Sequence, residues 1–452
     1  MTPILHRQRG AVTIMVAAAM LVLLAMVGLV LDSGFAYMVK ARLNAAVDSA
    51  ALAGARAVTS GNTEAAQRAS AQTAAAQFFA ANIPDGYLLS TPELVETKVT
   101  FNVGTVTIDV TGKAKLPLSI MQAMGFEAMT PYATAQTIRK DLDMMLVVDT
   151  SGSLKDYGST VQSSAKSFLN KFNVTQDRVG LVHFASGAVL DQPIETTARG
   201  FKRDAMVSTI TNYEFIGGTS SFEGMWHARE QLKSIPEARR SSLRVIVFFS
   251  DGAPTSFGTY LNFDSGKCDL AGAVDMVGSG MYKLNVGENI YVSTDCTLKS
   301  STTAWAKNLP AWYNGRNPKN NPNDPALREF PIVTTAATPT PRKVSSDIST
   351  ATNFKQNVDR AARNLAEAIA AKARNEDIYV FTLGMGASLK QASGVDNEKG
   401  EDVLKCMANV ADGPSRCYNP AQRVGMYCYA ATDADLTPCF SKLASAILRI
   451  SK

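Results

Sequence analysis

The chain has 452 residues, of which 19% are charged, and its formal net charge is +5. This charged fraction is below the roughly 25% of ordinary soluble domains, which leaves room for a membrane segment. The absence of a basic cluster argues against a nucleic-acid partner. The apolar content of 46% excludes bulk disorder, and the length predicts two to three domains. Three histidines are too few for a histidine-rich metal enzyme, and all six cysteines lie beyond residue 260.

The N-terminal part of the chain is an apolar run without charge over residues 11–31. As a helix rising ~1.5 Å per residue, this run spans the ~30 Å hydrocarbon core of a bilayer. A cleaved signal peptide is the alternative, but its apolar region covers only ~7–15 residues, so an uncleaved transmembrane helix is favoured. Arg7 and Arg9 precede the run with no acidic residue, which predicts a cytoplasmic tail over residues 1–10. Paired cysteines persist outside the cytosol, so we expect the bulk of the chain there.

An alanine-rich stretch without proline follows over residues 32–60, and we expect it to continue as a helix out of the bilayer. Residues 61–140 predict a small α+β module with no catalytic constellation, whose expected role is spacing or interaction. Its expected elements are a helix over 62–83, strands over 95–103 and 105–116, a short helix over 117–125 and a strand over 133–139.

From residue 141 onward, apolar strands alternate with helices, which is typical of an α/β fold with a mainly parallel sheet. The first continuous apolar run, residues 144–148, suits a strand buried on both faces. It ends in Asp149, Ser151 and Ser153, at the strand end where open α/β sheets bind ligands. Asp251 follows a second such strand, and Thr219 lies in a glycine-rich loop before a helix.

These residues resemble the von Willebrand factor A domain with its metal-ion-dependent adhesion site, over about residues 141–452. That site combines a DxSxS loop with a threonine and an aspartate from two further loops, matched by Asp149, Ser151, Ser153, Thr219 and Asp251. The resemblance implies a doubly wound, Rossmann-like fold. It also implies Mg²⁺ (or Ca²⁺ or Mn²⁺) held by hydroxyl and carboxylate oxygens, with an open position for a carboxylate from a protein partner. Hard oxygen ligands suit these cations independently of the resemblance.

Two alternatives compete for this motif. A helix N-cap explains the DxSxS residues but not the threonine and aspartate of the other loops. A phosphatase-type DxDxT loop needs an aspartate where Ser151 stands, and the spaced pair Asp141 and Asp143 precedes the strand instead of ending it. Because no serine triad or cysteine–histidine pair is evident, we expect a binding protein and not an enzyme. His183 and His227 are expected to be packing or surface residues.

The alternation stops between residue 256 and about residue 352, where Asn, Pro and Thr are frequent. We interpret this stretch as an insertion rising from the metal-binding face. Trp305, Trp312 and Tyr313 are candidate partner contacts, although packing within the insertion is the favoured role. Six cysteines allow 15 connectivities, and their positions favour a Cys268–Cys296 bridge. We expect two further bridges among Cys406, Cys417, Cys428 and Cys439, because the CxxC spacing of a zinc site is absent.

The N-terminal region resembles TadG-like proteins of the tight-adherence (Flp) pilus assembly system. The similarity rests on the Arg-Gly pair ending at Gly10, on Asp32 and Gly34 after the apolar run, and on the LNAAVDSAALAGA stretch at residues 43–55. In that family an N-terminal anchor precedes an extracytoplasmic von Willebrand A-like domain. Related minor pilins carry a glutamate five residues after the prepilin cleavage glycine. Met15 stands at that position, which argues against prepilin-type cleavage.

Together these patterns predict a single-pass protein of the bacterial inner membrane, with its N-terminus cytoplasmic and its bulk periplasmic. Its expected partner is another component of the type IVb (Flp/Tad) pilus machine. The alternative is a surface adhesin that binds a matrix or host protein through the same metal site, and an enzyme is the weakest option. The expected organisation is a tail, a transmembrane helix, a helical extension, an α+β module and a von Willebrand A-like domain, over residues 1–10, 11–31, 32–60, 61–140 and 141–452, with an insertion at about 256–352.

Overall fold

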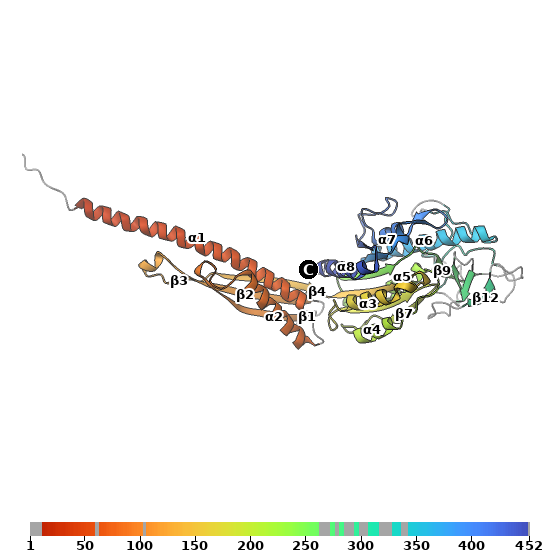
Figure 1. Ribbon diagram of the computed structural model, residues 1–452, viewed down its shortest axis with the longest axis horizontal. Helices are drawn as coiled ribbons and strands as arrows, with labels where there is room; N and C mark the ends of the chain where they lie inside the picture. The colour runs from red at the N-terminus through yellow and green to blue at the C-terminus, as the bar shows by residue number, and fades with distance from the viewer. Residues whose placement is uncertain are drawn as a thin grey trace, which may run out of the picture. The chain divides into compact units, whose positions relative to one another are not determined.

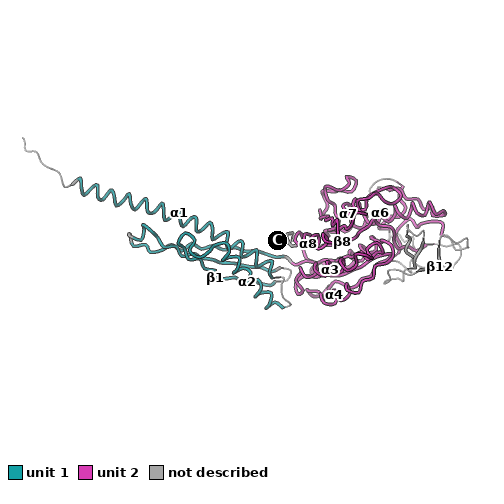
Figure 2. The backbone as a smooth tube through the Cα atoms, in the orientation of Figure 1, with its two compact units in different colours: residues 1–139 teal, residues 140–452 magenta. Residues whose placement is uncertain are grey.

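The computed structural model describes residues 11–58, 63–102, 105–261, 272–275, 280–283, 293–297, 306–315, 328–335 and 342–450. The chain divides into two compact units, residues 1–139 and residues 140–452 (Figure 2). Each unit has buried hydrophobic clusters of its own.

The first unit combines two helices with a four-stranded sheet. Its elements are α1 (Ala11–Ala57), α2 (Glu64–Asn82), the 3₁₀ turn η1 (Tyr87–Leu89), β1 (Thr91–Asn102), β2 (Thr105–Pro117), the 3₁₀ turn η2 (Met121–Met124), β3 (Ala128–Met129) and β4 (Tyr132–Lys140). β2 pairs antiparallel with β1 and β3, and it also pairs with β4. The expected order of helix, hairpin and third strand is present, whereas the short helix expected over 117–125 is only the four-residue turn η2.

The helix α1 has two parts with different surroundings. Most apolar side chains between Val12 and Leu31 are exposed. Beyond this run, residues buried in the core of the first unit recur every three or four positions, as at Val39, Leu43 and Val47. Among the described residues, α1 is the one helix long and apolar enough to cross a membrane. The extension expected after the apolar run is the uninterrupted continuation of the same helix.

The second unit is built around a six-stranded sheet with helices on both faces (Figure 1). The sheet order is β16-β13-β8-β5-β6-β7, and every neighbouring pair is parallel except β6 and β7. The strands are β5 (Leu142–Asp149), β6 (Arg178–Phe184), β7 (Ala188–Gln192), β8 (Leu243–Ser250), β13 (Ile378–Met385) and β16 (Met426–Ala430), with a separate small pair β14 (Ala392–Ser393) and β15 (Glu398–Lys399).

The helices of this unit cover the sheet in two layers. Residues of α5, α6 and α7 pack on one face, and residues of α3, α4 and α8 pack on the other. This arrangement confirms the doubly wound α/β fold. The helices are η3 (Gly152–Tyr157), α3 (Gly158–Leu169), α4 (Arg203–Thr211), α5 (Ser221–Ser234), η4 (Glu237–Arg239), α6 (Ala351–Asn375), η6 (Ala387–Lys390), α7 (Gly400–Ala408), η7 (Asp433–Asp435) and α8 (Leu436–Ile450).

The central strand β5 shows why its sequence is continuously apolar. All eight of its residues are buried. Met145 and Val147 belong to the core on the α5 and α6 side, whereas Met144, Leu146 and Val148 belong to the core on the α3 and α8 side. Successive side chains of a strand point to opposite faces, so a strand covered on both sides needs an apolar residue at every position.

The insertion expected over residues 256–352 is in part a packed component of the domain. Its first half contributes a four-stranded antiparallel sheet. In its second half, isolated apolar residues such as Leu309, Phe330 and Ile348 are buried in the core with α5 and α6. The strands of the insertion are β9 (Ser256–Thr259), β10 (Gly272–Asp275), β11 (Gly280–Lys283) and β12 (Ser293–Thr297).

Two of the three aromatic candidates in the insertion lie within the described residues. Tyr313 is buried, its ring centroid lies 4.3 Å from that of Phe222, and its hydroxyl donates to Glu223 Oε1 at 2.6 Å. Its role is therefore packing, and it is not an exposed partner contact. Trp312 is half-buried, and Trp305 lies outside the described residues.

The last four cysteines form the two bridges expected among them. One bridge joins α7 to the loop that follows it, and the other joins β16 to α8. The pairs are Cys406–Cys417 and Cys428–Cys439. The bridge expected between Cys268 and Cys296 involves side chains outside the described residues.

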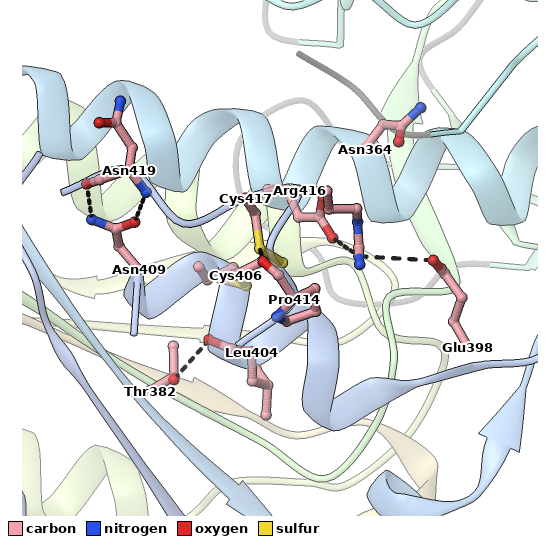
Figure 3. Close-up of a disulfide and its surroundings, with 12 residues drawn as sticks. Asn364, Thr382, Glu398, Leu404, Cys406, Asn409, Pro414, Arg416, Cys417 and Asn419 are labelled. Atoms are coloured by element: carbon pink, nitrogen blue, oxygen red, sulfur yellow. Dashed lines mark hydrogen bonds and ion pairs between the residues drawn. A yellow bond between two sulfur atoms is a disulfide. The ribbon is translucent and has the colours of Figure 1, made fainter. Parts of the chain in front are cut away.

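The loop closed by the first bridge is also held by hydrogen bonds (Figure 3). The amide Nδ2 of Asn409 donates to the carbonyl oxygen of Asn419 at 2.8 Å, and the backbone N–H of Asn419 donates back to Asn409 Oδ1 at 2.7 Å. Arg416, within this loop, donates to Glu367 Oε1 at 2.9 Å. The bridge therefore fixes a loop that also bonds to α6.

Candidate metal centre

The five residues singled out from the sequence lie on three loops at one edge of the sheet. β5 and β8 are parallel neighbours, and their register pairs Val148 with Phe249. Asp149 is the last residue of β5, and Asp251 directly follows β8, so both carboxylates reach the same edge. Thr219 lies two residues before the first residue of α5. The carboxyl ends of the strands thus meet where open α/β sheets bind ligands.

Backbone hydrogen bonds tie the DxSxS loop to the loop that carries Thr219. The N–H of Ile216 donates to the carbonyl of Thr150 at 2.8 Å, and the N–H of Gly152 donates to the carbonyl of Gly217 at 3.0 Å. Gly217 has φ +88°, in the left-handed region, and a Cβ there would lie 2.8 Å from Ser186 Oγ. Only glycine therefore fits this turn without strain or displacement.

The third loop is bonded to the second. The N–H of Thr219 donates to Thr255 Oγ1 at 3.0 Å, and the N–H of Thr255 donates to the carbonyl of Thr219 at 2.9 Å. The hydroxyl oxygen of Thr219 lies 3.8 Å from the position that a Cβ would take at Gly252, so it faces the residue after Asp251. The relative positions of the three loops are thus fixed by the fold itself.

Four of the five side chains contact one another or the backbone of another member. The Oγ of Ser153 donates to Asp251 Oδ1 at 2.9 Å and lies 3.1 Å from Ser151 Oγ. The N–H of Ser151 donates to Asp149 Oδ1 at 2.8 Å. The structure therefore brings the residues of the DxSxS loop together with Asp251, and it sets the threonine hydroxyl beside them.

The two carboxylates are buried without a basic partner. Asp149 is fully buried, Asp251 is 8% exposed, and within the described residues no Lys, Arg or His forms an ion pair with either. Burial raises the pKa of Asp149 to about 6, against the lowering effect of hydrogen bonds from Ser250 and Ser151. Burial and the charge of Asp149 raise the pKa of Asp251 to about 7. Two buried carboxylates so close together are unfavourable when both are ionised, and a cation between them would relieve that cost.

The donor set fits a hard divalent cation. Carboxylate and hydroxyl oxygens are the ligand types that Mg²⁺, Ca²⁺ and Mn²⁺ prefer. Among the described residues, no three or more His, Cys, Asp or Glu side chains are placed to hold a metal ion by themselves, so hydroxyl oxygens are needed to complete a ligand set here. Ser151 and Thr219 are buried, whereas Ser153 is exposed, so the group opens to solvent on the side of Ser153.

One supporting residue was not identified from the sequence. The Oγ of Ser250 donates to Asp149 Oδ2 at 2.5 Å and accepts from the N–H of Gly252 at 3.2 Å. It therefore holds the carboxylate of the first loop against the third loop. The available signal was a hydroxyl residue ending the apolar run of β8 next to Asp251, but a serine at a strand end is too common to single out.

Other polar residues considered from the sequence have structural partners elsewhere. Asp143 lies near the start of β5, away from Asp149, and forms ion pairs with Arg178 at 3.2 Å and Arg199 at 2.9 Å. The Nδ1 of His183 lies 2.8 Å from Asp191 Oδ2. These contacts account for both residues as parts of the packed fold.

Comparisons with known proteins agree with the two resemblances read from the sequence. Residues 144–253 match the family model of the von Willebrand factor type A domain, and residues 10–57 match that of the putative Flp pilus-assembly TadE/G-like family. No curated protein matches the chain.

Similar solved structures include two pilus proteins and one byssus protein. The pilus adhesin SpaC from Lactobacillus rhamnosus GG is 14% identical, with a TM-score of 0.38, over 80% of this chain and 34% of SpaC. The vWF domain of the type V pili tip protein Mfa5 from Porphyromonas gingivalis is 17% identical, with a TM-score of 0.37, over 70% of this chain and 98% of that domain. Proximal thread matrix protein 1 from the mussel byssus, with a zinc-occupied MIDAS motif, is 11% identical, with a TM-score of 0.32. The match covers 69% of this chain and 46% of that protein's chain.

This chain spans about a third of the SpaC chain that it resembles. The N-terminal segment is therefore similar to the TadE/G-like family, and the part of the second unit around β5 to β8 is similar to the von Willebrand factor type A domain.

Proposed function

We propose that this protein is a membrane-anchored component of Flp/Tad pilus assembly or anchoring that binds a protein partner through a divalent cation. The observation that carries the proposal is the group of five oxygen-bearing side chains on three loops, with two buried carboxylates that no basic side chain among the described residues neutralises. Mg²⁺ is the proposed cation, because every donor is a hard oxygen.

The roles of the side chains follow from their positions. Ser151, Ser153 and Thr219 would contribute neutral hydroxyl oxygens, and Asp149 and Asp251 would contribute carboxylate oxygens directly or through water. When bound, the cation supplies a positive charge with an open position for a carboxylate of the partner. The exposed Ser153 marks the side from which that carboxylate would approach. We propose binding alone, with no catalytic step.

The proposed location is the inner membrane, with the N-terminal tail cytoplasmic, residues 11–31 in the bilayer and the chain beyond residue 31 periplasmic. The exposed apolar surface of α1 supports an anchor, and Arg7 and Arg9 before it support the orientation. The two disulfide bridges support an oxidising compartment for the second unit.

Partner capture from the native host tests this proposal. The full-length protein would be crosslinked in cells, purified in Mg²⁺ or in EDTA, and the co-purifying proteins identified. The test variant is Asp251→Asn, and the control is Asp204→Asn, which alters an exposed carboxylate of α4. We expect the wild type and the control to retain a pilus-machine protein in Mg²⁺, and we expect EDTA or Asp251→Asn to release it.

Capture that is unchanged by both EDTA and Asp251→Asn would contradict the cation-dependent function. Cell fractionation tests the location separately. Retention in the inner membrane fits an assembly role, whereas exposure on the outer surface would contradict it and indicate an adhesin instead.

A further inference from the structure

The last turn of the apolar run on α1 is a docking site for another part of the first unit. Gly28 and Asp32 lie four residues apart, on the same face of the helix, and both are buried. This face continues into the buried residues Ala36 and Val39, whereas the neighbouring Leu29 and Val30 remain exposed. The apolar side chains of the helix are therefore mostly exposed before this turn, and after it one face of the helix packs against the rest of the first unit.

The segment that docks there is the tip between β2 and β4, which we define as residues 118–129. The carboxylate of Asp32 accepts hydrogen bonds from three backbone N–H groups of the tip. The donors are Ser119 at 3.0 Å, Ile120 at 3.2 Å and Met121 at 3.0 Å. A Cβ added at Gly28 would lie 2.5 Å from Ile120 Cγ2, so the absence of a side chain there allows the close approach. The tip is thereby held beside the end of the apolar run.

This attachment fixes the level of the tip relative to a bilayer. Residues 28 and 32 are separated by about 6 Å along a helix, and the charge-free run ends at Leu31. The ~30 Å hydrocarbon core needs ~20 residues of helix, which the run supplies only if it is used almost to its end. A bilayer crossed by this run therefore has its outer boundary at the turn where the tip is docked.

The tip has the composition of an interfacial segment. Its sequence, LSIMQAMGFEAM, carries a single charge, on Glu127. Phe126 is 56% exposed and Met129 is 42% exposed, and Tyr132, just beyond the tip at the start of β4, is 56% exposed. Aromatic side chains are enriched where a protein crosses the boundary between lipid and water, and apolar residues exposed at that level bury their surface in the headgroup region.

We propose that the tip, residues 118–129, lies in the outer headgroup boundary of the bilayer that α1 crosses and forms a second membrane contact. This inference rests on the proposed membrane anchor and adds to it a site that holds the first unit against the lipid surface. The occupant is lipid because the tip is docked at the turn where the exposed apolar run of α1 ends, and because the tip itself exposes Phe126 and Met129. Asp32 is then a positioning residue, which satisfies three backbone donors at a level where water is scarce.

Quenching of tryptophan fluorescence by brominated lipids tests the proposal on the full-length protein in liposomes. The test variant is Phe126→Trp, and Met129→Trp repeats the measurement at a second position of the tip. The matched control is Ile138→Trp, which alters a residue of β4 that is 41% exposed but lies about 20 Å along the strand from Tyr132. The wild type, which has three tryptophans, gives the background for subtraction.

After subtraction of the wild-type background, we expect lipids brominated near the headgroup to reduce the tryptophan emission of Phe126→Trp and Met129→Trp. We expect liposomes to shift that emission to shorter wavelengths. The emission of Ile138→Trp should be unchanged by the brominated lipids. Quenching of the tip variants no stronger than that of the control overturns the proposal. A blue-shifted but unquenched spectrum also overturns it, because the tip is then covered by protein, such as a second copy of the chain.

A further variant separates failure of this inference from failure of the anchor. Leu21→Trp alters an exposed residue in the middle of the apolar run. If lipids brominated deep in the acyl chains quench this variant while the tip variants stay unquenched, the tip proposal fails and the anchor stands. If the Leu21→Trp emission is also unquenched, the proposed anchor itself fails.

Discussion

Replacing Asp149 by asparagine removes a buried negative charge and keeps the shape of the side chain. The amide oxygen can accept the hydrogen bond from the N–H of Ser151, and the amide nitrogen can donate to Ser250 Oγ. In the metal-free protein, burial raises the pKa of Asp149 from 3.8 to about 6. The folded state then binds more protons than the unfolded state between these pH values, so stability falls as the pH rises from about 4 to about 6.

Above pH 6 the metal-free folded state has lost about 3 kcal/mol of unfolding free energy through the ionisation of Asp149, at about 1.4 kcal/mol for each unit of pKa. We therefore expect metal-free Asp149→Asn to be more stable than metal-free wild type at pH 8. For a unit of about 300 residues this difference corresponds to a rise in Tm of roughly 5 °C. Mg²⁺ at 100 times its Kd should stabilise the wild type by about 2.7 kcal/mol and leave the variant unchanged.

Thermal unfolding of the purified protein at pH 5 and pH 8, in EDTA and in Mg²⁺, measures both effects. Asp204→Asn serves as the control for a change of charge on the surface, and its Tm should follow the wild type in every buffer. The reasoning is refuted if Mg²⁺ does not raise the Tm of the wild type, or if Asp149→Asn keeps the full Mg²⁺-dependent rise.

Three other substitutions test separate parts of the structure. Asp32→Ala removes the acceptor for three backbone N–H groups, so hydrogen exchange at amides 119–121 should become faster, whereas Asp48→Ala, at an exposed position of the same helix, should leave it unchanged. Replacing Cys406 and Cys417 together by serine opens a loop with a sequence separation of 11. In denaturant titrations this double substitution should lower the unfolding free energy by about 3 kcal/mol. Equal unfolding free energies of the variant and the oxidised wild type would contradict this. Tyr313→Phe removes a buried hydrogen bond from the insertion to α5 and should cost about 1–2 kcal/mol in the same assay, and a neutral effect would mean that the insertion is held without it.

The central sheet and the candidate metal centre were accessible from the sequence because their signals are strong. The runs that became β5 and β8 are apolar at nearly every position, which only a strand covered on both faces requires. Asp149 and Asp251 each follow such a run, so parallel strands bring them to one edge without any knowledge of the loops. The loop that carries Thr219 was located by its glycines and by that threonine.

The elements that sequence reasoning missed have weak local signals. β16 has five residues of mixed burial, and α7 has nine, so neither length nor periodicity distinguishes them from a loop. The packed second half of the insertion buries isolated residues such as Leu309 and Phe330 among Asn and Pro, with no repeat to reveal them. The turn η2 is fixed by Asp32, which is 87 to 89 residues away in the sequence, so its form is decided by tertiary contact.

The most direct test of the central claim is the anomalous scattering of Mn²⁺ in crystals of the chain beyond residue 31, grown or soaked with that cation. We predict one strong anomalous peak at the carboxyl edge of the sheet, within coordination distance of Ser151 Oγ and Ser153 Oγ, and its loss in Asp251→Asn crystals. A map with no peak among the three loops, or with an unchanged peak in the variant, would contradict the assignment of this group of oxygens as a divalent-cation site.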